Sequence, residues 1–300
     1  MHNTSPGKRP FYKYLTPDTT LAILETQSVR YSSPLSFNDP FDIQAGLHFE
    51  FELTGLHEKI IDRIQALAAS PSAPNVDSND VWGQIVLKAR EYYPTHGFNK
   101  KHWIELTTHS FAVLNKIIAV TQEQYQAQWR EKLLPSIRVF CVSEERDNLL
   151  MWSHYAKDHT GAVLELWSLP EEDNLLSIAR PIDYSANPFP FFTETEWIDD
   201  LTGIKKLDSN ALFQNYAYAK SDLWKYENEW RVWYPDSTSG EPFDTVPLRQ
   251  SEVSSIYFGC KANADFIRKA VAQCRSSFPN AKVFQAHKLS KNYGLEFAEI

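Results

Sequence analysis

The pattern of apolar and polar positions predicts a chain that mixes strands with helices. Apolar stretches of strand length occur at residues 11–14, 29–33, 137–143, 161–167, 181–184, 254–259 and 283–286. From about Leu53 to Leu134 the apolar residues instead recur at helical spacing, in segments 56–67, 82–93, 103–120 and 123–134. We therefore expect one α+β domain over residues 1–300, with 53–134 as a helical insertion within it.

Local signals place further helices. Thr16, Pro17 and Asp18 supply a cap residue, a proline for the first turn and an acid near the positive helix end. Asp147 or Asn148 can cap a second helix that runs through 151–155, and Gly161 is placed to end it. Other helical patterns cover residues 194–200, 208–220 and 262–275.

An unusual set of charges lies at residues 224–234. If this segment is one strand, its period of two puts Glu227, Glu229 and Arg231 on one face and aromatic residues on the other. Such a face is typical of the polar wall of a cleft. An edge strand with an internal Glu-Arg ladder has the same pattern, and the segment alone does not separate the two interpretations.

Composition is that of a globular protein, with 43% hydrophobic residues and 14% aromatic residues. There is no run of about 18 apolar residues and no apolar segment near the start, so neither a membrane span nor export is expected. The three cysteines are few, odd in number and far apart, which argues against a disulfide framework. We expect a cytoplasmic protein.

The net charge of -8 argues against nucleic acid as a general binding partner. An acidic chain has no general attraction for phosphate backbones, so contact with nucleic acid requires a local basic groove. No such groove is visible in the sequence, and nucleic acid remains possible only as a substrate.

The helix pattern at 151–159 is a candidate ligand surface. Trp152, Tyr155 and His159 recur at helical spacing, with His154 on an adjoining stripe, and together they can stack a flat heterocycle. Aromatic residues at this spacing usually form core, and a single histidine among them is usually a satisfied core group. We assign Trp152 to the core, and His154 and Tyr155 to function.

Other chemistries lack their signatures. The spacing of His154 and His159 is not that of a zinc-binding helix, and no GxSxG, GxGxxG or GxxxxGK[ST] motif occurs. Cys141 lies in an apolar strand, where burial raises a thiol pKa. A bound nucleotide must therefore be held by aromatic residues, asparagine and strand ends.

Five short segments together resemble a bacterial family, domain of unknown function 2971. They are residues 12–14, 33–34, 37–41, 151–155 and 224–231, in this order. The order of elements is also similar to the ADP-ribosyltransferase fold, in particular its DarT-like branch, which implies a split, twisted β-sheet with flanking helices. The first strand here lacks the histidine or arginine usual in those enzymes.

The second resemblance implies a function, NAD-dependent transfer of ADP-ribose to a macromolecular acceptor, either protein or nucleic acid, by a toxin or antiphage effector. It places the catalytic glutamate at Glu229, and we expect Arg231 to act beside it and Glu227 and His154 to orient these groups or activate the acceptor. It places the residues that bind NAD at Lys13, Tyr14, Ser33, Asn38, Asp39, Tyr155 and Trp224.

The chemistry expected from this resemblance centres on Glu229, whose carboxylate would stabilise positive charge on the ribose as nicotinamide leaves. Arg231 would bind the pyrophosphate, and Tyr14 or Tyr155 would stack on nicotinamide. Two other functional classes are alternatives to the transferase. One is a non-catalytic sensor of a nucleotide or protein, and the other is a metal-dependent nuclease.

Overall fold

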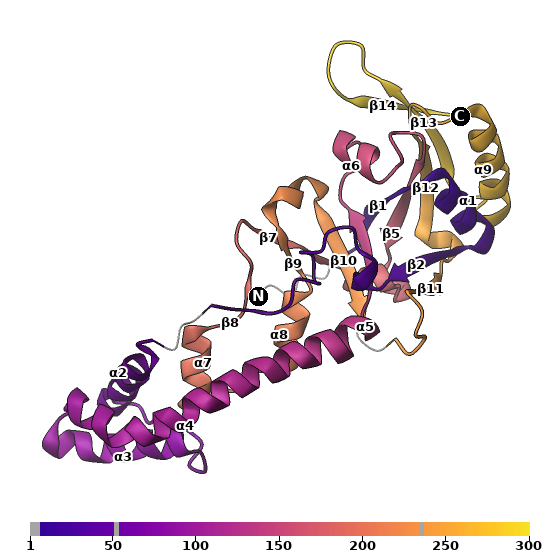
Figure 1. Ribbon diagram of the computed structural model, residues 1–300. Helices are drawn as coiled ribbons and strands as arrows, with labels where there is room; N and C mark the ends of the chain where they lie inside the picture. The colour runs from indigo at the N-terminus through magenta and orange to yellow at the C-terminus, as the bar shows by residue number, and fades with distance from the viewer. Residues whose placement is uncertain (1–6, 51–53, 235–236) are drawn as a thin grey trace. The chain divides into compact units, whose positions relative to one another are not determined.

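The chain forms two compact units in a computed structural model that describes residues 7–50, 54–234 and 237–300 (Figure 1). The sheet unit comprises Met1–Ala45, Leu133–Asn187 and Tyr218–Ile300. The helical unit comprises Gly46–Lys132 and Pro188–Ala217. Leu53, the expected start of the helical stretch, lies outside the described residues.

Ten strands of the described residues form one mixed, twisted sheet in the sheet unit. They are β1 (Arg9–Leu15), β2 (Ser28–Ser32), β4 (Arg138–Ser143), β5 (Ala162–Ser168), β6 (Arg180–Pro181), β10 (Glu229–Tyr234), β11 (Phe243–Pro247), β12 (Val253–Phe258), β13 (Lys282–Lys288) and β14 (Leu295–Glu299). The order is β11-β2-β4-β1-β5-β12-β13-β14, with β10 paired to β4 and to β6. Only β12 and β13 pair in parallel within this sheet, and the expected α+β class is confirmed.

Pairing between β1 and β4 is almost absent, and the candidate site lies beside this gap in the sheet. Strand β4 pairs with β10 over six positions, but with β1 it pairs only at Tyr12 and Ser143. β1 instead pairs with β5 along its whole length. A separate parallel pair, β7 (Asp183–Ser185) and β9 (Ala219–Ser221), belongs to the same unit.

Apolar residues cover both faces of this sheet. Phe11 and Leu15 of β1 belong to the main core with residues of α1 (Pro17–Thr26) and α9 (Ala264–Ser277). The alternate residue Tyr14 faces a second cluster with α6 (Leu149–His154). Trp152 of α6 is fully buried there, edge-on to Tyr14 at 5.6 Å between ring centres, so its assignment to the core is confirmed.

Two predicted helix caps are present. The Thr16 hydroxyl accepts a hydrogen bond from the Thr19 amide at 3.3 Å. The Asn148 side chain accepts from the amides of Leu150 and Met151 at 3.1 and 3.2 Å. These bonds satisfy donors that the first turn of a helix leaves without intrahelical partners.

Gly161 does not end α6, which stops at His154; it lies where the turns after α6 meet the start of β5. A Cβ atom at this position would be 2.0 Å from the carbonyl oxygen of Leu15 and 3.1 Å from that of Ala156. Both neighbours are backbone atoms, so they cannot rotate away. Gly161 is needed for this close approach of two chain segments.

The helical unit contains α2 (Leu56–Ala69), α3 (Val81–His96), α4 (Lys100–Ala127), all but the last residue of a π-helical turn (Gln128–Leu133), α7 (Glu194–Leu201), α8 (Ser209–Tyr216) and the short strands β3 (His48–Glu50) and β8 (Pro190–Thr193). The expected break between 120 and 123 is wrong, because α4 runs through it. The helix expected over 208–220 ends at Tyr216, and β9 follows. Of the described helices, none has the length and apolar character to cross a membrane.

The remaining short helices are η1 (Pro34–Ser36), α5 (Leu134–Ser136), η3 (Pro170–Glu172), η4 (Leu175–Ile178), η5 (Asp222–Glu227) and η6 (Gln250–Glu252). Helix η5 corrects the strand expected over 224–234. It is a 3₁₀ helix that ends at Asn228 in the left-handed region, with φ 41°, and β10 begins only at Glu229. Glu227 therefore does not share a strand face with Glu229.

Candidate active site

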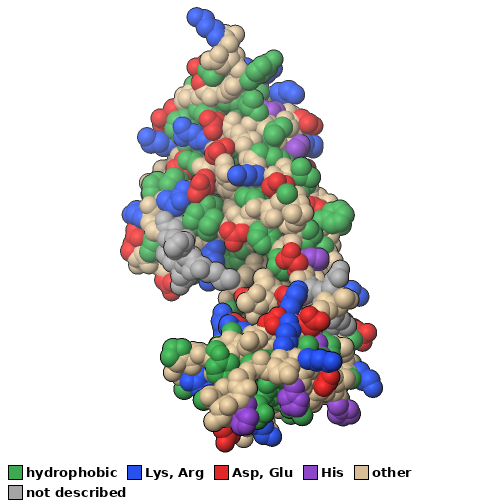
Figure 2. All heavy atoms as spheres, turned by 90° about the vertical axis from the view of Figure 1, so that its left-hand side faces the viewer, with side chains coloured by type: hydrophobic (Ala, Val, Ile, Leu, Met, Phe, Trp, Pro, Cys, Tyr) green, Lys and Arg blue, Asp and Glu red, His purple; other side chains and the backbone are tan. Residues whose placement is uncertain are grey.

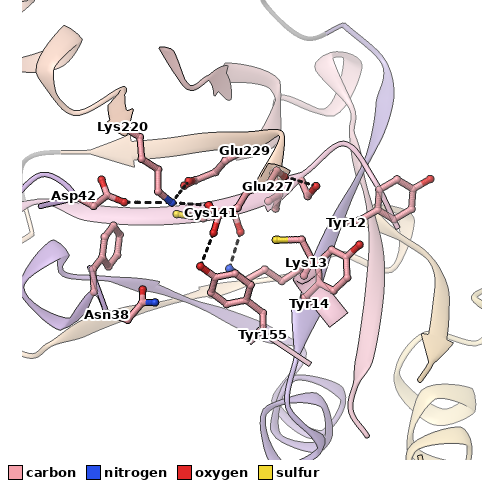
Figure 3. Close-up of a pocket in the computed structure, with 14 residues that line it drawn as sticks. Tyr12, Lys13, Tyr14, Asn38, Asp42, Cys141, Tyr155, Lys220, Glu227 and Glu229 are labelled. Atoms are coloured by element: carbon pink, nitrogen blue, oxygen red, sulfur yellow. Dashed lines mark hydrogen bonds and ion pairs between the residues drawn. The ribbon is translucent and has the colours of Figure 1, made fainter. Parts of the chain in front are cut away.

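A cavity of about 180 Å³ opens beside the division between β1 and β4 (Figure 3). It lies wholly within the sheet unit. Its lining residues are Tyr12, Lys13, Tyr14, Phe37, Asn38, Asp42, Cys141, Val142, Ser143, Met151, Tyr155, Lys220, Glu227 and Glu229. The volume is below the range of about 300–1,000 Å³ typical of drug-sized ligand sites, so the cavity fits one ring or sugar rather than a whole dinucleotide.

Three carboxylates surround the ammonium group of Lys220 on one side of the cavity. Lys220 Nζ lies 2.5 Å from Glu227 Oε2, 2.8 Å from Glu229 Oε2 and 3.5 Å from Asp42 Oδ2. Figure 3 shows the lysine between these acids, which come from η5, β10 and the loop after η1. All four side chains are nearly buried.

Arg231 is the fifth residue of this network of ion pairs. Its Nε donates to Glu229 Oε1 at 2.5 Å, and one terminal nitrogen donates to Asp42 Oδ2 at 2.5 Å. The side chain is fully buried and does not line the cavity. Arg231 therefore holds the acids in place, and a direct grip on a pyrophosphate is not consistent with this position.

Glu229 is a fully paired carboxylate. Burial by itself would raise its pKa, but the charges of Arg231 and Lys220 outweigh burial and hold the pKa well below its ordinary value. Both of its oxygens accept hydrogen bonds from these cations. The group stays ionised and is already neutralised by the protein.

Glu227 is held differently. Its Oε1 accepts a hydrogen bond from the Tyr155 hydroxyl at 2.5 Å, and its Oε2 accepts from Lys220. Burial raises the pKa of Glu227, and the opposing charge of Lys220 does not cancel the rise. A buried carboxyl with a raised pKa that lines a cavity is a candidate for proton exchange with a ligand.

Asp42 has a free acceptor. The side chain is 4% exposed, and Oδ2 is engaged by Lys220 and Arg231, whereas Oδ1 has no hydrogen-bond partner among the described residues. An unpaired buried oxygen is costly. Because Asp42 lines the cavity, a ligand with an N–H or O–H donor can satisfy it.

The opposite side of the cavity is aromatic and apolar, with Tyr14, Tyr155, Phe37 and Met151. The Tyr14 hydroxyl donates to the Glu145 carbonyl at 2.8 Å, which fixes the ring. Lys13 lies at the gap between β1 and β4, where its Nζ donates to the Cys141 carbonyl at 2.6 Å. Burial lowers the pKa of Lys13.

The cavity brings together six of the predicted residues: Lys13, Tyr14, Asn38, Tyr155, Glu227 and Glu229. His154 is not among them. Its exposed ring bonds through Nδ1 to the Tyr226 hydroxyl at 2.9 Å, outside the lining.

Three predicted binding residues also lie outside the lining. Ser33 is buried and caps η1 by accepting from the Leu35 amide. Asp39 accepts from the amide of Phe41, as expected of a turn residue. Trp224 lies under the Lys220 ammonium, 5.2 Å from nitrogen to ring centre, and so supports a lining residue.

The helical unit contributes no residue to this lining among the residues described. Metal binding is not supported either: no three His, Cys, Asp or Glu side chains in the described ranges are placed to hold an ion. Of the residues expected to converge on a metal in a nuclease, Glu227 and Glu229 pair with Lys220 instead, and Asp39 and His154 lie outside the lining.

Residues 151–232 match the profile of a family described as a protein of unknown function (DUF2971). This segment belongs to the DUF2971 family. No curated protein and no solved structure matches the chain.

The DUF2971 segment supplies five lining residues: Met151, Tyr155, Lys220, Glu227 and Glu229. The rest of the lining comes from β1, the loop after η1 and β4, which lie outside the segment. The cavity is therefore not a property of the DUF2971 segment alone.

Two charged residues of this site were missed by sequence reasoning. Asp42 follows the turn at 37–41 by one position, which is the only local signal it carries. Lys220 ends a stretch with a helical pattern and gives no sign of burial. The acids that it pairs with could have suggested a buried cation but not which one.

Proposed function

We propose that the cavity is the active site of an enzyme that cleaves the glycosidic bond of NAD and transfers ADP-ribose to a macromolecular acceptor. The observation that supports this most is Glu227, a buried carboxyl with a raised pKa at a cavity that has aromatic residues opposite. In this proposal the fold is a variant of the split sheet of ADP-ribosyltransferases. The ring-sized volume admits the nicotinamide ring, and the rest of NAD lies outside.

The proposed reaction needs a proton acceptor and a stabilising charge. The bond between nicotinamide nitrogen and ribose C1′ breaks, and its electron pair goes to nicotinamide. An oxygen or nitrogen of the acceptor bonds to C1′, and its proton goes to Glu227. The three carboxylates exceed the two cations, Lys220 and Arg231, by one negative charge, and this excess stabilises positive charge on the ribose while the bond breaks.

This assigns roles that differ from those expected from the sequence. Glu227 is the catalytic carboxyl, and Tyr155 orients it through the hydrogen bond at 2.5 Å. Glu229 and Arg231 hold Lys220 and Asp42 in position. The free oxygen of Asp42 accepts from the carboxamide or a ribose hydroxyl.

Glu227→Gln tests the assignment. Because the amide cannot accept the proton, we expect nicotinamide release from NAD to fall by about 100-fold or more. Release is measured with protein extract, single-stranded nucleic acid and duplex nucleic acid as acceptors. Glu123→Gln, at an exposed position on α4, makes the same chemical change away from the cavity and should retain full activity.

The outcomes separate the alternatives. If the wild-type protein releases no nicotinamide with any acceptor, and neither NAD nor ADP-ribose raises its melting temperature, the proposal is wrong. Equal release by the wild-type protein and Glu227→Gln would support the enzymatic activity but show that Glu227 is not the catalytic group.

A non-catalytic sensor is the second candidate, and the complete pairing of Glu229 favours it. A carboxylate already neutralised by two cations is suited to build a rigid pocket. In this case NAD or ADP-ribose raises the melting temperature, whereas no nicotinamide is released and Glu227→Gln changes only affinity.

Asn38→Ala probes binding without disturbing the ion network. Asn38 lines the cavity, its side chain is exposed, and it makes no hydrogen bond to the described residues. Loss of one hydrogen bond to the ligand should weaken NAD binding about 3- to 10-fold, or about 0.5–1.5 kcal/mol. Calorimetry should detect this at an unchanged melting temperature, with the exposed Asn187→Ala as the control. Unchanged affinity would place the ligand elsewhere.

A further inference from the structure

A second hollow of about 820 Å³ lies at the end of the sheet unit that carries the β13–β14 hairpin. Its lining residues are Leu149, Ser153, Asp158, His159, Cys260, Lys261, Lys288, Leu289, Ser290, Lys291, Asn292, Tyr293, Gly294 and Leu295. It shares no lining residue with the cavity beside Lys220. We call it the hairpin groove.

The hairpin groove is basic although the chain is acidic. Lys261, Lys288 and Lys291 are exposed, and none of them forms an ion pair with a described residue. Asp158 is the one acid in the described lining. Three lysines without acidic partners give a local positive potential in a protein whose net charge is -8.

The floor of the groove is held in a strained conformation. Lys157, Asp158 and His159 all have positive φ, at 47°, 55° and 66°. Non-glycine residues rarely adopt this conformation, and three in succession persist only where the surroundings impose it. The His159 carbonyl accepts from the Lys261 amide at 3.0 Å, so this segment fixes the backbone that carries Lys261.

Gly259 permits the contact. A Cβ atom there would be 2.1 Å from the His159 carbonyl oxygen. The His159 ring stacks on Trp152 and bonds through Nε2 to the Ser153 hydroxyl at 3.2 Å. Burial lowers the pKa of His159, and Lys261 adds to this effect, as expected if the lysine lies near the ring.

An aromatic side chain stands at the edge of the groove. Tyr293 lies in the hairpin loop beside Asn292 and is fully exposed, at 102%. At the top of Figure 2, a basic and an apolar side chain project from the surface. The β13–β14 hairpin is at the same height in Figure 1, because the two views differ only by a turn about the vertical axis. Exposed aromatic rings next to lysines are the elements with which proteins bind single strands, because bases stack on the ring while phosphates contact the cations.

We propose that the hairpin groove binds single-stranded nucleic acid. Phosphates contact Lys261, Lys288 and Lys291, and a base stacks on Tyr293, with Ser290 and Asn292 available for hydrogen bonds. The lysines come from the loop after β12, the end of β13 and the hairpin loop, along an open hollow, a layout that suits a strand better than one small anion. The recessed shape and polar loop residues favour nucleic acid over a lipid surface.

A triple variant, Lys261→Ala with Lys288→Ala and Lys291→Ala, tests the charges. Binding of labelled single-stranded DNA and RNA of about 16 nucleotides is followed by fluorescence anisotropy at several salt concentrations. Each lost phosphate contact contributes about 0.7 to the slope of log affinity against log salt. We expect the variant to bind at least about 10-fold more weakly, with a slope shallower by about 2.

The control removes the same charge elsewhere. Lys101, Lys116 and Lys132 are exposed in the helical unit and form no ion pair with the residues described, so their triple alanine variant should keep wild-type affinity and slope. Tyr293→Ala should weaken binding about fivefold or more and leave the slope unchanged.

Several results would overturn the proposal. They are absence of binding by the wild-type protein, equal losses in the two lysine triples, binding to anionic phospholipid vesicles but not to oligonucleotides, and a response to inorganic phosphate alone. The assay contains no NAD, so its result is independent of the chemistry proposed for the other cavity.

Discussion

Replacing Arg231 with methionine should lower the free energy of unfolding by about 3–5 kcal/mol, the usual result of removing one partner from a buried ion pair. The side chain is fully buried and bonds to Glu229 and Asp42. Methionine fills similar space but carries no charge. Two buried carboxylates would then depend on Lys220 alone, which Glu227 already engages.

The pH dependence should change with this substitution. In the wild-type protein the lowered pKa of Glu229 contributes stability above its ordinary value of 4.5, and this stability is lost as pH falls below it. Without Arg231 the effect of burial is less opposed and the pKa of Glu229 rises, so ionisation above pH 4.5 becomes unfavourable for folding. The difference between the two proteins should therefore be largest near neutral pH and shrink towards pH 4.

Urea denaturation of both proteins between pH 4 and 7 provides the measurement. Arg268→Met removes an exposed ion pair with Asp265 on α9 and should leave stability nearly unchanged at every pH. A small loss for Arg231→Met that does not vary with pH would mean that the buried network contributes little to folding.

Gly161→Ala should destabilise the sheet unit by about 3 kcal/mol or more, at the upper end of the cost of overpacking. The new methyl group would lie 2.0 Å from the Leu15 carbonyl oxygen and 3.1 Å from that of Ala156. Leu15 belongs to β1 and pairs with Ala162 of β5, so relief requires the two strands to separate at this end.

Gly294→Ala is the matched control. Its Cβ atom would lie 2.9 Å from a terminal methyl group of Leu289, which can rotate away. Thermal unfolding should show a large decrease for Gly161→Ala and a small one for Gly294→Ala. Similar decreases would indicate that β1 and β5 adjust freely around position 161.

Secondary structure was predictable where its signals are local. The caps at Thr16 and Asn148 act within three residues, and both were identified from sequence. The prediction of a strand over 224–234 is wrong before Glu229, because Asn228 adopts the left-handed conformation and ends η5 there. The alternation of residue types over 224–228 therefore does not reflect strand structure. The break expected between 120 and 123 is absent, because the partly buried residues 121 and 122 continue α4.

The site was predictable only in part because its bonds are long-range. Glu229 and Glu227 stood out as acids in an aromatic context, but Arg231 meets Asp42 across 189 positions of the chain. Nothing near Asp42 or Lys220 in sequence indicates such a partner. The hairpin groove was hidden for another reason: a net charge of -8 averages over the chain, whereas Lys261, Lys288 and Lys291 meet only after β13 joins β12.

The central place of β1 has a consequence for synthesis on the ribosome. Tyr14 bonds to Glu145, 131 residues further along the chain, and the main partner strand of β1 follows later still. Because synthesis adds about 5–20 residues per second, β1 exists for on the order of ten seconds before its partner strands β4 and β5 are synthesised. Its apolar edge is open to other chains during that interval. The nascent chain is therefore expected to be the most aggregation-prone form of this protein and the one that most needs a chaperone.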